Sequence, residues 1–159
     1  MTQRLNFFHQ SPELSKKLIE LGALFQKTTI ETNIRELVEI RASQLNGCAF
    51  CVDMHIKQAK IHGERELRLH HVAIWRESTL FVPRERAALA WTEAVTHLGA
   101  HGVPDEIYER VLTQFSEKEL SDLTFLIGSI NAWNRLNVAF RMVPGSSDKA
   151  FGLDKAGLE

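Results

Sequence analysis

The sequence contains the stretch Cys48-Ala49-Phe50-Cys51-Val52-Asp53-Met54-His55, which holds both cysteines of the 159-residue chain. In a helix, residues three, four and seven apart lie on one face. A helix that starts near Cys48 therefore lines up Cys48, Cys51 and His55 along one stripe. Asn46-Gly47 comes directly before the stretch and is typical of a chain reversal or a helix C-terminus. The sequence thus predicts a cysteine pair at the N-terminus of a new helix.

The start of a helix is a favourable place for a reactive cysteine. Its unpaired backbone N–H groups and the positive end of its dipole stabilise a thiolate relative to a thiol. With a second cysteine at disulfide distance and a histidine nearby as proton carrier, the stretch has the parts of a redox site. The alternative is that both cysteines are small buried apolar side chains.

Apolar residues recur at helical spacing along most of the chain, and no segment shows the alternation of a strand. The expected helices cover residues 12–27, 33–46, 48–62, 64–75, 83–98, 104–115 and 117–141. Ser116, with Glu119 three residues later, predicts a capping box at the start of the last helix. The sequence therefore predicts an all-α fold with about seven helices.

A chain of 159 residues is expected to form one domain, residues 1–159. Within it we expect an N-terminal arm (1–10) that packs on the body or on another subunit, a core (11–143) and a C-terminal tail (144–159). Pro144-Gly145 ends the last helix, and the tail is predicted to become ordered only against a partner. The three tryptophans have core spacing: Trp75, Trp91 and Trp133.

The bulk composition argues against two classes of partner. The net charge is −1 and 44% of residues are apolar, so nothing indicates nucleic acid or a polybasic membrane contact. No apolar run is long enough for a membrane span, and Met1–Asn6 lacks the apolar core of a signal peptide. A cytoplasmic location follows as the expectation, and there a closely spaced cysteine pair is more often catalytic or metal-binding than a structural disulfide.

Four residues in register resemble the alkyl hydroperoxidase D-like (AhpD-like) branch of the carboxymuconolactone decarboxylase superfamily. The pattern is a glutamate twelve residues before the first cysteine, then Cys-x-x-Cys, then a histidine four residues later. Glu36, Cys48, Cys51 and His55 fill these places. The similarity is best over residues 35–98, and the stretches 83–86 and 130–135 are similar to peroxidase-related members of the branch.

The resemblance implies an all-helical homo-oligomer, a trimer or hexamer, with thiol peroxidase activity and no cofactor. It implies that Cys51 attacks the peroxide, that Cys48 resolves the resulting sulfenic acid, and that Glu36 and His55 relay protons. A thiol or dithiol protein then serves as reductant. The chain departs from the pattern at Phe50, where the best-studied type of this family has a second histidine, so the proton relay is one titratable group shorter.

Other interpretations of these residues stay open at this level. His55 is also compatible with a partly buried structural histidine, and Glu36 with a capping box closed by Asn33. Glu39 is a near neighbour of Glu36 but is expected on a different face of the helix.

The competing functions are a zinc module and a redox sensor without turnover. Zinc would be held by Cys48, Cys51, His55 and one further ligand, but structural zinc sites usually pair two such knuckles.

In the final helix, three polar residues either border the site or anchor helices to one another: Asn131, Asn134 and Arg135.

Overall fold

The computed structural model describes residues 2–158, so Met1 and Glu159, the outer ends of the expected arm and tail, lie outside that range. Within it the chain forms nine α-helices, two 3-10 helices and no β-strand beyond an isolated bridge between Gly99 and Gly102. The elements are α1 (Phe7–Gln10), α2 (Pro12–Phe25), α3 (Thr32–Leu45), α4 (Ala49–Ile61), α5 (Glu66–His71), η1 (Val72–Ile74), α6 (Pro83–Thr96), α7 (Asp105–Leu112), α8 (Glu117–Phe140), α9 (Asp148–Phe151) and η2 (Leu153–Ala156).

The predicted all-α fold is confirmed. Helices α2 to α8 occupy the segments that the helical spacing marked, and α1 and α9 add single turns in the arm and the tail. The capping box at the start of α8 is present: the Ser116 hydroxyl accepts from the Glu119 backbone N–H, and the Glu119 carboxylate accepts from the Ser116 N–H at 2.8 Å. These ends were predictable because capping depends on residues close together in the chain.

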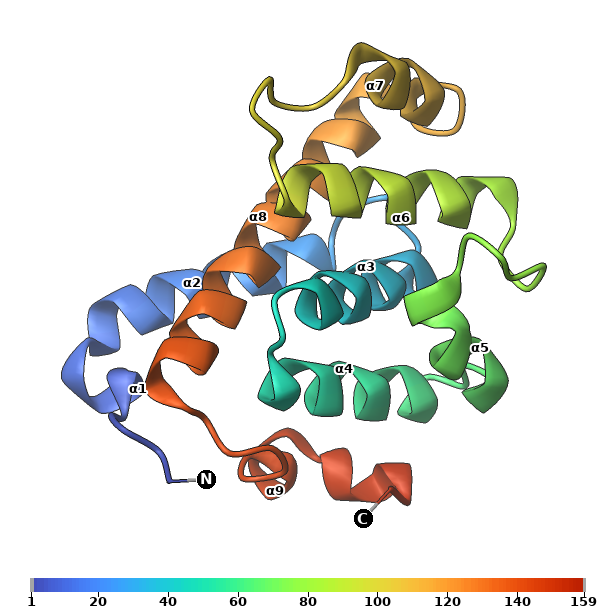
Figure 1. Cartoon of the computed structure of the whole chain (residues 1–159). Coiled ribbons are helices and arrows are strands. Elements are labelled where there is room, and N and C mark those ends of the chain that lie inside the picture. The colour runs from blue at the N-terminus through green and yellow to red at the C-terminus, as the bar shows by residue number, and fades with distance from the viewer. Residues whose placement is uncertain (1, 159) are drawn as a thin grey trace.

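Helix α3 lies at the centre of the molecule and packs against α4, α6 and α8 (Figure 1). Two consecutive residues of α3, Leu37 and Val38, belong to two different apolar clusters. Both are at most 1% exposed. A helix that buries successive residues in different clusters is enclosed on several sides. The turn from α3 to α4 passes through Gly47 at φ +64°, a left-handed conformation that glycine adopts without steric cost.

The N-terminal arm packs on the body of its own chain. Phe7 is buried, and its ring lies beside those of Trp133 and Phe140 on α8. The Arg4 N–H donates to the Phe140 carbonyl at 2.9 Å. Of the two alternatives for the arm, packing on the body is therefore realised within one chain.

The C-terminal segment, residues 144–158, packs on α4 of its own chain. The prediction that this segment becomes ordered only against a partner is therefore wrong. Lys57, 6% exposed, donates to Asp53 at 2.9 Å and to Asp148 at 2.6 Å. Burial alone would lower the pKa of Lys57, but the hydrogen bonds to Asp148 and Asp53 outweigh it and raise that pKa. Leu153 is buried against this side of the body, so an ion pair and apolar contact hold the segment.

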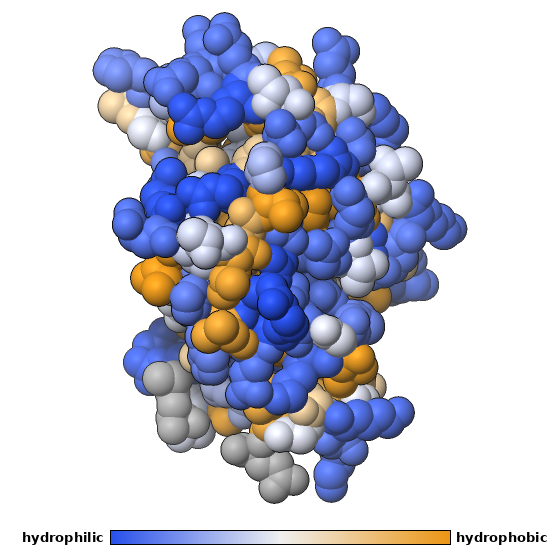
Figure 2. All heavy atoms as spheres, turned by 90° about the vertical axis from the view of Figure 1, so that its right-hand side faces the viewer, coloured by the Kyte–Doolittle hydropathy of each residue, from blue (hydrophilic) through white to orange (hydrophobic). Residues whose placement is uncertain are grey.

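Figure 2 shows one face of the molecule, which is mostly hydrophilic with a few small hydrophobic patches. None of the helices in residues 2–158 combines the length and apolar character that crossing a membrane requires.

Candidate functional site

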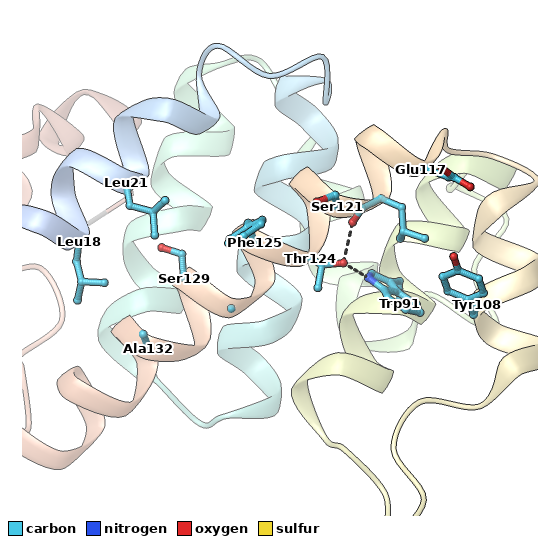
Figure 3. Close-up of a pocket in the computed structure, with 12 residues that line it drawn as sticks. Leu18, Leu21, Trp91, Tyr108, Glu117, Ser121, Thr124, Phe125, Ser129 and Ala132 are labelled. Atoms are coloured by element: carbon cyan, nitrogen blue, oxygen red, sulfur yellow. Dashed lines mark hydrogen bonds between the residues drawn. The ribbon is translucent and has the colours of Figure 1, made fainter.

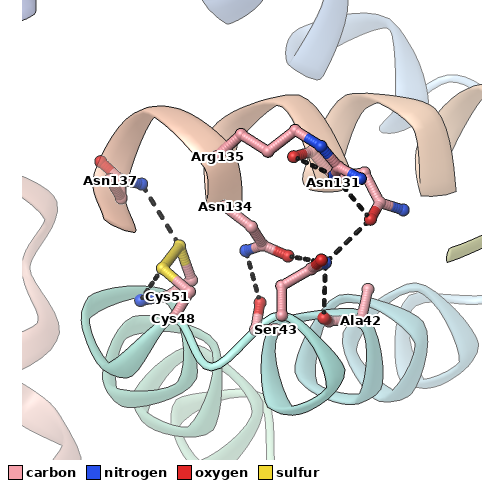
Figure 4. The surroundings of a disulfide bond; sticks show 9 residues. Ala42, Ser43, Cys48, Cys51, Asn131, Asn134, Arg135 and Asn137 are labelled. Carbon is pink, nitrogen blue, oxygen red and sulfur yellow. Dashed lines mark hydrogen bonds between the residues drawn. A yellow bond between two sulfur atoms is a disulfide. The ribbon is translucent and has the colours of Figure 1, made fainter. Parts of the chain in front are cut away.

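The cysteine pair stands at the start of α4, as predicted. Cys48 is the N-cap residue, and its sulfur accepts from the backbone N–H of Cys51 at 3.3 Å. The two sulfurs are joined in a disulfide, with a Cα–Cα distance of 5.4 Å (Figure 4). Both side chains are almost completely buried, so chemistry at either sulfur depends on an internal path to it.

Cys51 lines a cavity of about 340 Å³ between α2, α3, α4, α8 and the two terminal segments. Most of the wall is apolar, and its aliphatic and aromatic residues are Phe8, Leu18, Ile19, Phe25, Phe50, Met54, Ile130, Trp133 and Phe151. The polar residues of the wall are Glu39, His55, Gln58, Ser129, Asn137 and Ser147. The cavity therefore joins a reactive sulfur, a few polar groups and a large apolar surface.

His55 shares this cavity with Cys51 and is 5% exposed. Its Nδ1 lies 3.0 Å from the Gln58 Oε1 and 3.4 Å from the Glu39 Oε2. Because both oxygens accept hydrogen bonds, the neutral ring carries its proton on Nδ1 and leaves Nε2 with a lone pair. Nε2 is buried and has no hydrogen-bond partner among the described residues. A buried acceptor without a partner is costly, and a catalytic role is one explanation for it.

Glu36, the second expected member of the proton relay, does not line the cavity of Cys51 and His55. Its carboxylate accepts from Nδ1 of His62, in a separate hollow that contains neither cysteine. Burial raises the pKa of Glu36 above its ordinary value of 4.5, and the hydrogen bond from His62 offsets part of that rise. The capping-box alternative is also wrong, because the N-cap of α3 is Glu31. Glu36 and Glu39 contact different histidines, His62 and His55.

Asn137 is a site residue that the sequence interpretation missed. Its side-chain amide donates to the Cys51 sulfur at 3.2 Å (Figure 4), and it is 5% exposed. The available signal was the recurrence of asparagine every third residue, at 131, 134 and 137, in the C-terminal half of the helix. Three buried amides on one face require partners on the helices that α8 crosses.

The other two asparagines anchor helices. Asn46, at the end of α3, donates to Asn131 Oδ1 at 2.8 Å and to Asn134 Oδ1 at 2.9 Å. Asn134 donates to the Ser43 hydroxyl at 3.0 Å, and Arg135 donates to the Asn131 carbonyl. For Asn131 and Asn134, anchoring is therefore the interpretation that the contacts support, and it fixes the α3–α4 turn that carries Cys48; the Arg135 bonds stay within α8.

A second, larger hollow of about 740 Å³ lies along α8 beside α2, α6 and α7 (Figure 3). Leu18, Trp91, Tyr108 and Phe125 line it, but neither cysteine does. Within residues 2–158, no group of three or more His, Cys, Asp or Glu side chains is placed to hold a metal ion. The zinc alternative thus finds no ligand set in that range.

Comparison with known proteins places the chain in a family. The sequence profile described as "Carboxymuconolactone decarboxylase family" matches residues 12–94. The uncharacterised protein YdfG of Bacillus subtilis is 39% identical over 139 residues, which cover 87% of this chain and 95% of YdfG.

Solved structures of AhpD-like proteins are similar to this chain. A protein of unknown function from Agrobacterium tumefaciens, described as a candidate antioxidant defence protein AhpD, matches with a TM-score of 0.87 and 39% identity over 90% of this chain and 98% of that one. A peroxidase-related AhpD-core protein from Ralstonia eutropha matches with a TM-score of 0.78 over 88% of this chain and 75% of that one, at 20% identity, which supports the fold alone. The chain belongs to the carboxymuconolactone decarboxylase family and is AhpD-like.

Proposed function

We propose that this protein is a thiol peroxidase that reduces organic hydroperoxides and cycles through the Cys48–Cys51 disulfide. The observation that carries the proposal is that Cys51 and His55, whose Nε2 has no hydrogen-bond partner among the described residues, line one mainly apolar cavity. A proton acceptor that shares a cavity with a sulfur nucleophile can activate its thiol. The AhpD-like fold and the Cys-x-x-Cys pair agree with it.

In the first step the Cys51 thiolate attacks the terminal oxygen of the hydroperoxide ROOH. The S–O bond forms while the O–O bond breaks, which gives a sulfenic acid on Cys51 and an alkoxide, RO⁻, that takes up one proton to become the alcohol. In the second step the Cys48 thiol condenses with the sulfenic acid, releasing water and forming the disulfide. The sulfurs lose two electrons, and the peroxide gains them.

His55 handles the proton in this scheme. Nε2 accepts the proton of the Cys51 thiol and returns it to the departing alkoxide. Glu39, 3.4 Å from Nδ1, orients the ring and stabilises the imidazolium while it carries that proton. We therefore assign the carboxylate of the relay to Glu39, which replaces Glu36 in the arrangement expected from the family pattern.

The walls of the cavity favour a substrate with an apolar body. Phe50, which stands where the family pattern has a second histidine, lines the cavity and is 8% exposed. An aromatic side chain there adds apolar surface in place of a titratable group, and burial of apolar surface contributes about 25 cal/mol per Å². Hydrogen peroxide fits the cavity but gains nothing from these walls, so an alkyl or aryl hydroperoxide is the expected preferred substrate.

An enzyme must be reduced after each turnover, so the proposal includes a thiol or dithiol protein as reductant. A one-shot redox sensor would stop at the disulfide. The two functions differ in whether peroxide consumption exceeds one molecule per protein when a reductant is present.

The test follows consumption of cumene hydroperoxide and of hydrogen peroxide with excess dithiothreitol. The Cys48→Ser/Cys51→Ser double variant gives the background rate. We expect many turnovers above that background and a higher kcat/KM for cumene hydroperoxide. Without dithiothreitol, one equivalent of peroxide should remove both titratable thiols. If the reduced protein keeps both thiols after peroxide, the proposed function is wrong; if it loses them but never turns over, it is a sensor.

A further inference from the structure

The two sulfurs of the disulfide are held by different kinds of contact. Cys48 accepts a hydrogen bond from the backbone of its own helix, at Cys51 N. Cys51 accepts one from the side-chain amide of Asn137, which reaches it from α8, 86 residues further along the chain. Only the second contact depends on the identity of a side chain, so it is the one that a substitution can remove selectively.

The Cys51 sulfur has few charged neighbours. His55 on α4 and Glu39 on α3 line the same cavity. The Glu39 carboxylate lies beside Nδ1 of the His55 ring. On the C-terminal segment Asp148 is paired with Lys57, and the residues of α1 and α2 in the cavity wall are apolar. Asn137 is thus a neutral donor in a buried, weakly polar place, where a hydrogen bond to an anion is strengthened.

The sulfurs also meet different spaces. Cys51 lines the inner cavity, and Cys48 does not. Cys48 instead lines a shallow hollow of about 450 Å³ formed with Ser43, Gln44, Gly47 and Pro144. Cys51 does not line that hollow. The two cysteines therefore line two separate hollows, one on each side of the disulfide's residues.

We propose that Asn137 is a positioning residue that holds Cys51 as a thiolate, and that this makes Cys51 the leaving group when an external thiol reduces the disulfide at Cys48. The attacking thiolate forms a bond to the Cys48 sulfur, the Cys48–Cys51 bond breaks, and its electron pair stays on Cys51. The second thiol of a dithiol reductant then attacks the reductant sulfur that is bonded to Cys48. This step forms the reductant's disulfide and releases Cys48 as a thiolate. A better-stabilised thiolate leaves faster, so the hydrogen bond sets the direction of exchange.

This inference deepens the proposed function, because it concerns the same sulfur, but its test needs no peroxide. In the Cys48→Ser background, the rate of Cys51 alkylation by iodoacetamide is measured against pH with and without Asn137→Asp. That substitution keeps the shape of the side chain but replaces the donor with an acceptor. A hydrogen bond to a charged group is typically worth enough to shift a pKa by about one unit. We expect the apparent pKa of the Cys51 thiol to rise by about that much, with Asn137→Leu as a second variant.

The matched control is Asn134→Asp, one turn earlier on the same helix, where the buried amide contacts Ser43 and Asn46 and no sulfur. It is expected to lower the melting temperature without moving the thiol pKa. An unchanged pKa in both folded Asn137 variants, or an equal shift in the Asn134 variant, would overturn the proposal.

The direction of exchange is tested on the oxidised protein with both cysteines present. Brief treatment with glutathione, an acid quench and peptide mass spectrometry locate the mixed disulfide. We expect the adduct on Cys48, and a tenfold or larger rise in the share on Cys51 in Asn137→Asp. Adducts mainly on Cys51 in the parent protein would overturn the assignment. Neither result depends on whether the protein consumes peroxide, so failure here is distinct from failure of the peroxidase function.

Discussion

The carboxylate of Glu39 lies 3.4 Å from Nδ1 of His55, while the carboxylate of Glu36, one turn earlier on α3, accepts from His62. Two glutamates three residues apart thus contact two different histidines, His55 within α4 and His62 at its C-terminal end, and only the first pair belongs to the cavity of Cys51.

This arrangement predicts unequal effects of two equivalent substitutions. Glu39→Gln should lower kcat/KM for cumene hydroperoxide by about 10-fold to 100-fold, because a positioned proton relay contributes about 10²–10⁴-fold in all. Glu36→Gln should leave it within about 3-fold of the parent, since Glu36 contacts His62 and does not line the cavity of Cys51 and His55. Steady-state rates with dithiothreitol check this, and a larger loss in Glu36→Gln than in Glu39→Gln would contradict the assignment of Glu39.

The division of roles between the cysteines gives a second prediction. Cys51→Ser should abolish peroxide consumption, because the nucleophile in the substrate cavity is lost. Cys48→Ser should permit one attack and accumulate a sulfenic acid on Cys51 without steady turnover. Trapping with dimedone and mass spectrometry of each variant distinguishes them. Trapped acid on Cys48 in the Cys51→Ser variant would reverse the two roles.

The buried Glu36 should make stability depend on pH. Its raised pKa means that the folded protein binds the proton more tightly than the unfolded chain, so this contribution favours the fold at low pH. It is lost as the pH rises from the ordinary value of 4.5 through the higher folded pKa. Glu36→Gln removes this loss, so we expect its unfolding free energy, relative to the parent, to increase across that window. Urea unfolding at several pH values measures it, and the exposed Glu109→Gln serves as control; parallel pH curves for parent and Glu36→Gln would contradict it.

The Lys57 ion pairs should hold the C-terminal segment over the cavity, to which this segment contributes Ser147 and Phe151. Lys57→Met leaves the Asp148 and Asp53 carboxylates without their cation and should cost about 1–3 kcal/mol. Hydrogen exchange in residues 144–158 should become faster while exchange in α3 stays slow. Lys60→Met, which removes an exposed pair with Glu66, is the control and should cost at most about 1 kcal/mol. Unchanged exchange in the segment would show that apolar contact alone holds it.

We further propose the homo-oligomer that the family pattern implies, a trimer or hexamer. Phe125 is 65% exposed on the hollow along α8 (Figure 3), where another copy would cover it. Light scattering at micromolar concentration should give a multiple of the 18.1 kDa chain mass, and Phe125→Arg should lower that mass. A monomeric parent protein would contradict the assembly.

The sequence by itself determined the helices and the place of the cysteine pair. Helical spacing, the Asn46-Gly47 turn and the Ser116–Glu119 cap all depend on residues within a few positions of one another, so they could be interpreted without knowledge of the fold. For the same reason Cys48 and Cys51 were predictable as neighbours at a helix start.

Only the tertiary structure decided which side chains from other helices contact His55 and Cys51. The sequence offered two glutamates on α3, and the crossing of α3 and α4 selected Glu39 for His55. The packing of α8 across α4 places Asn137 beside Cys51. The C-terminal segment, which shows no strong apolar pattern, is held on α4 through the hydrogen bond from Lys57 to Asp148. These contacts join residues far apart in the chain, and their geometry follows from how whole helices pack, which spacing along one helix does not specify.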